Sequence, residues 1–224
     1  MHVTAVQISD NLAEHLHDDE IHVWHVPYRR AEQRQLLRKV LAGYLAIDVA
    51  DVLLVEGPHG RPALAEAHDS RLGFNWSHCA GDALIALGRQ VCPGVDLEHL
   101  RDRPRLLDIA ERFFTPAETA ALRVLPEAAR ASAFLALWTA KEAILKATGR
   151  GIAFGLDRLE IALMQGKPAL RWLDGEQVAE WQLVPLHVAP SLIAALAWRG
   201  DPRQVKLWRL ASDGSTAHCL RPAG

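Results

Sequence analysis

Residues 94–98 read Gly-Val-Asp-Leu-Glu. Apolar and acidic residues alternate here, which is the period-two pattern of a strand with one buried face. Alternate side chains of a strand share a face, so Asp96 and Glu98 project together while Leu97 turns into the core. Such a pair is half of a divalent-ion site, because hard cations prefer oxygen ligands.

Residues 138–146 read Trp-Thr-Ala-Lys-Glu-Ala-Ile-Leu-Lys. In a helix, residues four apart are neighbours, so Glu142 and Lys146 stand one above the other and Trp138 lies a further turn back. Glu142 is 46 positions beyond Asp96 (142 minus 96), so it joins the acidic pair only if the helix packs against the strand. Each motif alone is commonplace, since both occur often as solvated surface charges.

The composition predicts a folded, soluble chain. Its 224 residues are 50% hydrophobic, which supports a real core, and 25 basic against 27 acidic residues leave a net charge of -2. This balance argues against nucleic acid or an anionic membrane as a partner. Neither an export signal nor a stretch of 18 apolar residues is present, and the widely spaced Cys79, Cys92 and Cys219 suggest reduced thiols rather than zinc ligands. We therefore expect a cytoplasmic protein.

Hydrophobic periodicity predicts alternating strands and helices. The expected strands cover residues 20–26, 83–88, 95–98, 159–163, 169–172, 181–186, 192–198 and about 205–210. The expected helices cover residues 31–47, 105–114, 116–125 and 128–148, the last ending at Gly149 as a left-handed C-cap. The tail from Ser212 is polar, and we expect it to be frayed.

Three pairs of similar segments, in the same order, indicate an internal duplication. Gly60-Arg61-Pro62-Ala63-Leu64 returns as Gly166-Lys167-Pro168-Ala169-Leu170, His78 returns as His187, and residues 84–87 return as residues 192–195. We expect an α+β fold of two similar halves, residues 1–100 and 101–224, related by a pseudo-two-fold axis. Because two halves in one chain supply their own interface, we expect a monomer.

The motifs occur in the order seen in one enzyme family. They are Gly60-Arg61-Pro62, Phe74-Asn75-Trp76-Ser77-His78, residues 94–98, Phe113-Phe114-Thr115-Pro116-Ala117-Glu118, residues 138–146, and Gly149-Arg150-Gly151. With them the chain resembles the 4'-phosphopantetheinyl transferases of the surfactin-synthetase-activating type. The resemblance implies Mg2+-dependent transfer of phosphopantetheine from coenzyme A to a serine of an apo acyl-, peptidyl- or aryl-carrier protein, a holo-carrier-protein synthase activity that releases adenosine 3',5'-bisphosphate. It also implies a site in a cleft between the two halves.

The same resemblance assigns roles to individual residues. Asp96, Glu98 and Glu142 would bind Mg2+, with Glu142 also a base toward the serine, directly or through a water, and Lys146 a cation on the diphosphate or its leaving group. Coenzyme A would be bound by Arg34, Arg61, Ser77, His78, Lys141 and Lys146. Candidate residues for docking the acidic carrier are Arg112, Arg123 and Arg130, with Leu122 and Leu125 as exposed leucines. The basic cluster Arg101, Arg103 and Arg105 is expected to be a solvated face.

One departure and two alternatives remain open. The longer enzymes of this type have a basic amino-terminal segment, and only Pro27-Tyr28-Arg29-Arg30 stands in its place here. Fewer basic side chains would therefore hold the 3'-phosphate. The first alternative is another Mg2+-dependent nucleotide phosphotransferase, although no Gly-x4-Gly-Lys-Ser/Thr loop is present. The second is a non-catalytic module that binds carrier proteins. The sequence does not reveal which carrier or pathway is served.

Overall fold

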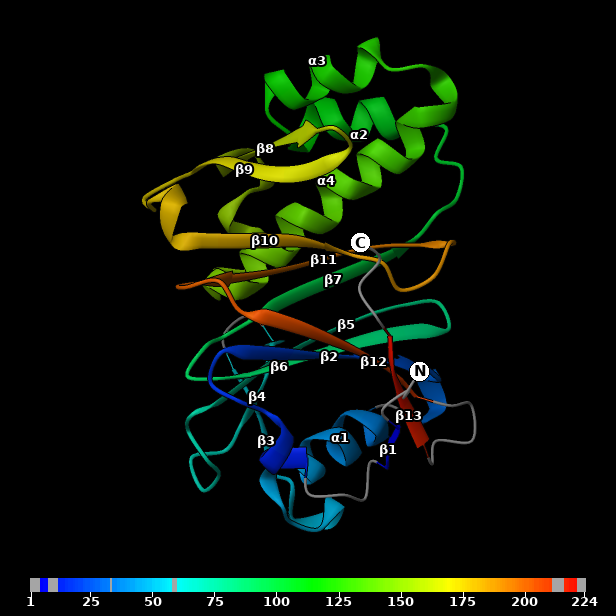
Figure 1. Ribbon diagram of the computed structural model, residues 1–224. Helices are drawn as coiled ribbons and strands as arrows, with labels where there is room; N and C mark the ends of the chain where they lie inside the picture. Colours follow the sequence, from blue (N-terminus) through cyan, green and yellow to red (C-terminus); the bar gives the residue numbers. More distant parts are fainter. Residues whose placement is uncertain (1–4, 8–11, 33, 58–59, 211–215, 221–224) are drawn as a thin grey trace. The chain divides into compact units, whose positions relative to one another are not determined.

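The structure is a computed structural model that describes residues 5–7, 12–32, 34–57, 60–210 and 216–220 (Figure 1). Side chains are described for these residues except 5–7, 32, 152 and 216–220. Unit 1 comprises Met1–Pro93 and Pro202–Gly224, and unit 2 comprises Gly94–Asp201. The division differs from halves 1–100 and 101–224 because strand pairing sets it: the strand bearing Asp96 pairs within unit 2, and the strand at 204–210 pairs within unit 1.

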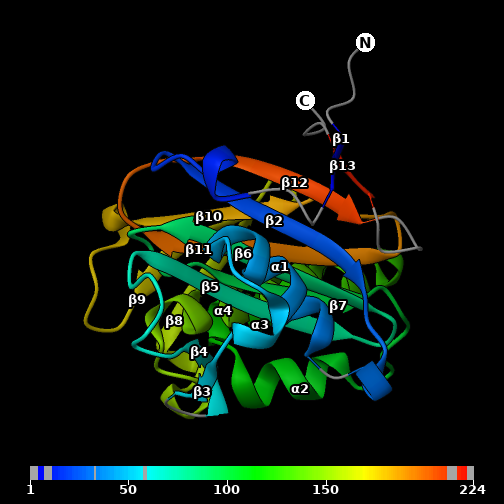
Figure 2. The ribbon, with the colours of Figure 1, turned by 90° about the horizontal axis from the view of Figure 1, so that it is seen from below.

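Unit 1 is built on a mixed sheet with strand order β1-β13-β12-β2-β6-β5. Its strands are β1 (Ala5–Gln7), β2 (Glu20–Pro27), β5 (Leu72–Cys79), β6 (Asp82–Arg89), β12 (Gln204–Leu210) and β13 (Thr216–Leu220), with a separate hairpin of β3 (Leu54–Glu56) and β4 (Pro62–Leu64). Its helices are α1 (Gln35–Leu45) and the short 3-10 turns η1 (Leu12–His15), η2 (Arg30–Glu32) and η3 (Val49–Asp51). The apolar side of α1 packs against β2, β6 and β5 in one core (Figure 2).

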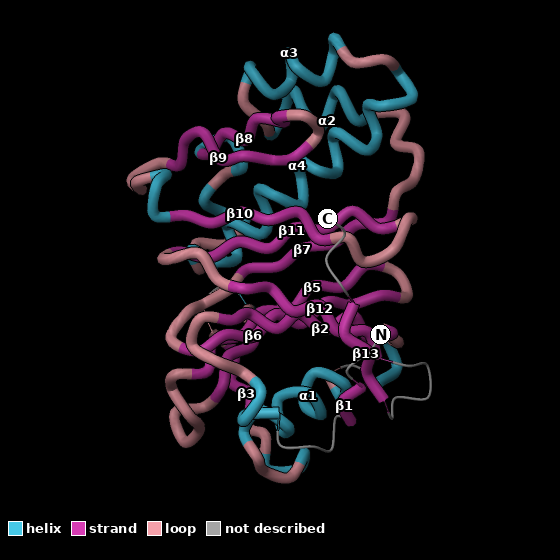
Figure 3. Tube along the Cα trace, viewed as in Figure 1, coloured by secondary structure: helices cyan, strands magenta, loops and turns pink. Residues whose placement is uncertain are grey.

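Unit 2 is built around one long helix. Its helices are α2 (Leu106–Phe113), α3 (Pro116–Val124) and α4 (Glu127–Thr148), with 3-10 turns η5 (Ile152–Phe154), η6 (Leu156–Arg158) and η7 (Val178–Glu180). Its strands are β7 (Gly94–His99), β10 (Trp181–Leu186) and β11 (Leu192–Arg199) in the order β10-β11-β7, and the hairpin β8 (Leu159–Met164) with β9 (Lys167–Leu173). Helix α4 packs against this three-stranded sheet and also contacts β8, β9 and the other two helices (Figures 1 and 3).

Gly94 sets how closely β7 approaches α4. A Cβ at this position would lie 2.0 Å from the carbonyl oxygen of Ala143 and 2.4 Å from the backbone nitrogen of Ala147. Only glycine leaves room for that contact. The first residue of the Gly-Val-Asp-Leu-Glu motif therefore brings the strand with Asp96 against the helix with Glu142.

The duplication expected from sequence is confirmed in the topology of the two units. In unit 1 the order is β2, α1, the hairpin β3–β4, β5 and β6, and β6 lies between β2 and β5. In unit 2 the order is β7, α4, the hairpin β8–β9, β10 and β11, with α2 and α3 inserted between β7 and α4, and β11 lies between β7 and β10. The pairings are antiparallel in both.

The helix expected over 128–148 is confirmed, with Gly149 in the left-handed conformation (φ 72°) at its end. The expected frayed tail is wrong for residues 216–220, which form β13 and pair with β12 and β1. Cys92 is a free thiol, as expected. Among the described residues, no helix has the length and apolar character needed to cross a membrane.

Candidate active site

Asp96 and Glu98 lie on the face of β7 that meets α4. In the antiparallel register with β11, Asp96 is opposite Ala195 and Glu98 is opposite Ile193. Directly paired residues project to the same side of a sheet, and Ala195 belongs to the core that packs against α4. Asp96 is buried and Glu98 is partly buried. The alternation predicted from sequence is confirmed for this strand.

Lys146 ties this strand to the helix. Its Nζ donates to Oδ1 of Asp96 at 2.7 Å and to the carbonyl oxygen of Val95 at 3.1 Å. The lysine side chain keeps about a quarter of its surface exposed (26%), whereas that of Asp96 keeps 9%. One face of this ammonium therefore holds Asp96 while the rest can meet a further anion.

Glu142, one helical turn before Lys146, is a buried carboxylate without a full set of partners. Only 6% of the surface of this residue is exposed. In the described part of the chain its Oε1 has no hydrogen-bond partner. Burial raises the pKa of Glu142 to about 7, and the negative charge of Asp96 adds to the rise. Lys146 opposes this effect, and the negative charge of Glu98 contributes a smaller increase. The charges of Asp96 and Glu98 on β7 thus act on Glu142 of α4.

The donor set fits a hard divalent cation, although the side chains do not already form a cage. Within the described residues, no group of three or more His, Cys, Asp or Glu side chains has the arrangement of a metal site. The partnerless oxygen of Glu142 and its raised pKa show instead that negative charge is crowded here, which a cation would relieve. Asp96, Glu98 and Glu142 are the residues that would hold it.

The assignment of Lys141 to coenzyme A is wrong. The side chain is fully buried, and its Nζ donates to the carbonyl oxygens of Leu156 (2.7 Å) and Leu159 (2.6 Å) and pairs with Oε2 of Glu118 at 2.7 Å. Glu118 also accepts from the backbone nitrogens of Thr115 and Ile161. Lys141 therefore fastens α4 to α3 and to the entry of β8, and burial lowers its pKa despite the partner carboxylate.

His78 lies exposed near the end of β5, the edge strand of the unit 1 sheet. Its ring stacks on Tyr28 with centroids 4.0 Å apart and planes 8° apart, and Trp76 lies 5.0 Å away. Ser77, the adjacent residue, is buried and projects to the opposite face of the strand. The structure thus places an aromatic surface around His78 that the sequence did not reveal.

The two arginines assigned to coenzyme A differ in their contacts and exposure. Nη2 of Arg61 donates to the carbonyl oxygen of Phe74 at 2.8 Å and to Sγ of Cys92 at 3.1 Å, so its guanidinium braces the segments on either side of it. Arg34 is exposed at the amino end of α1. Both residues, like Ser77 and His78, belong to unit 1, whereas the carboxylates and Lys146 belong to unit 2.

The docking surface inferred from sequence needs correction at two residues. Leu122 is fully buried, so it cannot offer an exposed apolar contact. Arg130 donates to the carbonyl oxygens of Leu125 and Arg123 and caps the turn between α3 and α4. Arg123 pairs with Glu111 on the surface.

Sequence reasoning also missed Arg103. Its Nη2 donates to Oε2 of Glu98 at 2.8 Å, so it touches one of the candidate ligands. Its position between Arg101 and Arg105 made all three look like one solvated cluster. The usable signal was proximity, because only four residues separate it from Glu98.

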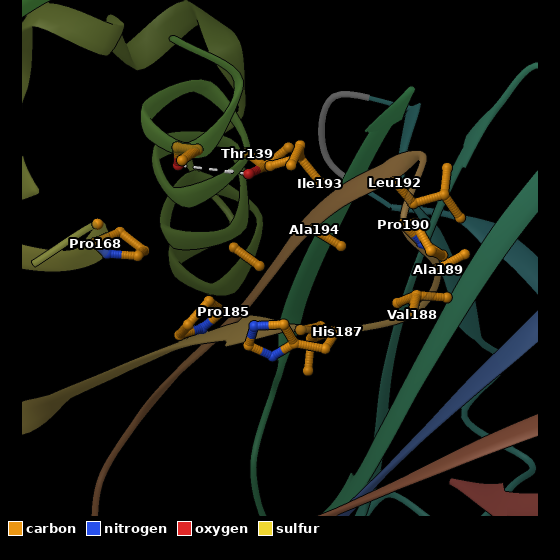
Figure 4. Close-up of a pocket in the computed structure, with 14 residues that line it drawn as sticks. Thr139, Pro168, Pro185, His187, Val188, Ala189, Pro190, Leu192, Ile193 and Ala194 are labelled. Carbon is orange, nitrogen blue, oxygen red and sulfur yellow. Dashed lines mark hydrogen bonds between the residues drawn. The ribbon is translucent and has the colours of Figure 1, made fainter. Parts of the chain in front are cut away.

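Unit 2 also has a largely apolar pocket of about 510 Å³ (Figure 4). Its lining includes Thr139 from α4, Pro168 from β9, Pro185 and His187 at the end of β10, and Ile193 and Ala195 from β11. Ile193 and Ala195 are the partners of Glu98 and Asp96 in the sheet.

The family model and the curated relatives agree on one family. Residues 93–197 match the family model described as the 4'-phosphopantetheinyl transferase superfamily. The 4'-phosphopantetheinyl transferase HetI of Nostoc sp. is 33% identical over 223 residues, covering 85% of this chain and 92% of that protein. The 4'-phosphopantetheinyl transferase Sfp of Bacillus subtilis is 29% identical over 130 residues, covering 58% of this chain and 56% of that protein. A solved holo-acyl-carrier-protein synthase of Thermotoga maritima aligns with a TM-score of 0.39 at 17% identity, over 58% of this chain and 84% of that one.

Proposed function

The chain belongs to the 4'-phosphopantetheinyl transferase superfamily, and from this premise we propose that it uses coenzyme A as donor and Mg2+ as its metal. As an enzyme of this family, it transfers phosphopantetheine to carrier proteins. The acceptor in the proposed reaction is a serine of an apo acyl-, peptidyl- or aryl-carrier protein. The other product is adenosine 3',5'-bisphosphate.

One observation carries this proposal: Glu142 is buried, lacks a partner at Oε1 and has its pKa raised to about 7 by burial and by the charge of Asp96. A carboxylate in this condition attracts a cation or a proton. Bound Mg2+ would neutralise the diphosphate and help orient it for displacement. Asp96, Glu98 and Glu142 are its proposed ligands.

The chemical step needs a base and a leaving-group cation. The serine Oγ forms a bond to the phosphorus that carries the pantetheine arm, and the bond from that phosphorus to the bridging oxygen breaks. In the proposed reaction Glu142 receives the serine proton, directly or through a water. The exposed part of the Lys146 ammonium meets the negative charge that develops on the departing bisphosphate.

The donor's other parts have candidate sites in both units. His78, on the aromatic surface with Tyr28 and Trp76, is proposed to receive the 3'-phosphate, with Arg34 and Arg61 as further cations. The apolar pocket lined by Thr139, Ile193 and Ala195 is proposed to hold the pantetheine arm, which carries a gem-dimethyl group close to the phosphate. Pockets of this size and character commonly enclose small molecules.

The deciding experiment is intact mass measurement of a panel of apo-carrier proteins after incubation with the enzyme, coenzyme A and Mg2+. A gain of one phosphopantetheine mass is expected, and it should disappear in Asp96→Asn and persist in the matched control Asp102→Asn, which changes an exposed acid in the loop after β7. A stable complex without mass change would indicate a binding module instead. Transfer by Asp96→Asn at the wild-type rate would remove Asp96 from the metal site.

Two broader features complete the proposal. The internal duplication supports a monomer, which sedimentation at several concentrations would test. A cytoplasmic location stays a prediction from the sequence. Which carrier is modified depends on docking contacts that the carrier panel would reveal.

A further inference from the structure

Of the three arginines that follow β7, Arg103 is the one that contacts an acidic residue of the site. Its Nη2 lies 2.8 Å from Oε2 of Glu98, and each of these side chains is about four-fifths buried, with 20% of its surface exposed. Arg105 instead pairs with Asp108 on the open surface, where the two side chains are 82% and 60% exposed. Arg101 is exposed as well. The expectation that all three form a solvated face is therefore wrong for Arg103.

The guanidinium of Arg103 is only half used by this contact. The Nε and Nη2 groups of an arginine lie side by side and form a fork that can bind a carboxylate or phosphate at two points. Glu98 occupies Nη2, while Nε is buried and has no hydrogen-bond partner in the part of the chain that the structure describes. A buried N–H group of this kind calls for an oxygen acceptor.

We propose that Arg103 is a positioning residue of the active site, which acts through Glu98. By holding Oε2, the arginine fixes the carboxylate on the α4 side of β7, so that Glu98 presents an oxygen toward Asp96 and Glu142. When the donor binds, an oxygen of its diphosphate completes the fork at Nε. This inference rests on the proposed metal role of Glu98.

Two opposite effects of Arg103 on a bound cation must be weighed. The guanidinium repels a divalent cation and competes with it for Glu98, so removing it could tighten binding. It also orients a ligand, and loss of the group that orients a metal ligand typically costs about 10–100-fold in metal affinity. We expect the orienting effect to be the larger of the two.

The test is direct binding of Mn2+ as a spectroscopic substitute for Mg2+, followed by electron paramagnetic resonance without coenzyme A. Arg103→Gln should weaken Mn2+ binding about 10-fold or more. Arg103→Lys, which keeps the charge without the fork, should recover part of this loss. Arg105→Gln is the matched control and should bind within about twofold of the wild type, since its partner Asp108 lies at the surface.

A double-mutant cycle tests whether Arg103 acts through Glu98. In a Glu98→Gln background, Arg103→Gln should have little further effect on Mn2+ affinity, because the orienting contact is already lost. Additive losses, or Mn2+ binding by Arg103→Gln that equals or exceeds that of the wild type, would overturn the inference. Suppose that either of those results is obtained while the wild-type protein binds Mn2+ and transfers phosphopantetheine. The proposed role of Arg103 would then be wrong, and the proposed function would stand. If the wild type bound no Mn2+ and transferred nothing, the proposed function would fail.

Discussion

Replacing Glu142 by Gln should stabilise the protein at alkaline pH when divalent cations are removed. The pKa of Glu142 rises from an ordinary value of 4.5 to about 7 on folding, mainly through burial. A rise of about 2.5 units (7 minus 4.5), at about 1.36 kcal/mol per unit, corresponds to an upper bound of about 3 kcal/mol. Gln mimics the protonated acid at every pH, so the variant escapes the cost of a buried negative charge.

The sign follows from which state holds the proton more tightly. Because the folded protein has the higher pKa, the stability contributed by protonated Glu142 is fully present below pH 4.5. It is lost as pH rises through about 7, and above that the deficit is constant. The variant and the wild type should therefore be close at pH 4.5 and differ most at pH 8.

Urea unfolding in EDTA at several pH values from 4.5 to 8 measures this difference. Glu66→Gln, at an exposed position of unit 1, is the control for general effects of removing a carboxylate. Parallel curves for the wild type and Glu142→Gln across this range would refute the reasoning. Adding Mg2+ at pH 8 should then stabilise the wild type and leave Glu142→Gln nearly unchanged, because a cation that binds only the folded state adds stability by mass action.

Three further outcomes are expected. Lys141→Met should cost about 3–5 kcal/mol in urea unfolding, because it leaves Glu118 charged and unpaired in the core, and adding Glu118→Gln should recover part of that loss; an unchanged midpoint would contradict the buried pair. His78→Ala should raise the KM for coenzyme A about tenfold and change the KM for 3'-dephospho-coenzyme A much less, since a contact to a charged group contributes about 1.5–3 kcal/mol; equal changes would remove His78 from the 3'-phosphate. Ala136→Phe should fill the apolar pocket and raise the KM for coenzyme A, whereas Ala128→Phe at an exposed position of α4 should not; equal KM values for both variants would place the pantetheine arm elsewhere.

Local elements could be predicted because their signals are local. The period of α4 and its glycine cap lie within the helix itself, and β10 has the predicted bounds of residues 181–186. The strand order could not be predicted, because β12 joins β2 in parallel across more than 180 residues of chain (204 minus 20). β13 was missed for the same reason: its five residues form a strand by pairing with β12 and with β1, which lies at the other end of the chain.

The motifs predict the residue types of the candidate site but not their surroundings. Asp96, Glu98 and Glu142 follow from two motifs, and Gly94 explains how these motifs come together. Lys141 was misplaced because an angle around a helix says which way a side chain points without saying what lies there. Between Phe134 and Leu145 nearly every position of α4 is buried, so even a lysine on another face of the helix enters a core.

Lys141 and Glu142 are adjacent, oppositely charged and buried in the same helix, yet their hydrogen-bond partners differ. The ammonium of Lys141 has two carbonyl oxygens and a carboxylate around it, whereas Oε1 of Glu142 has no partner in the described part of the chain. A buried polar atom left without a hydrogen bond costs about 1–3 kcal/mol, which a structural residue would avoid. The cost disappears when a ligand supplies the missing contact. The contrast between these two neighbours therefore assigns Lys141 to the scaffold and supports the proposal that Glu142 binds a cation or a proton.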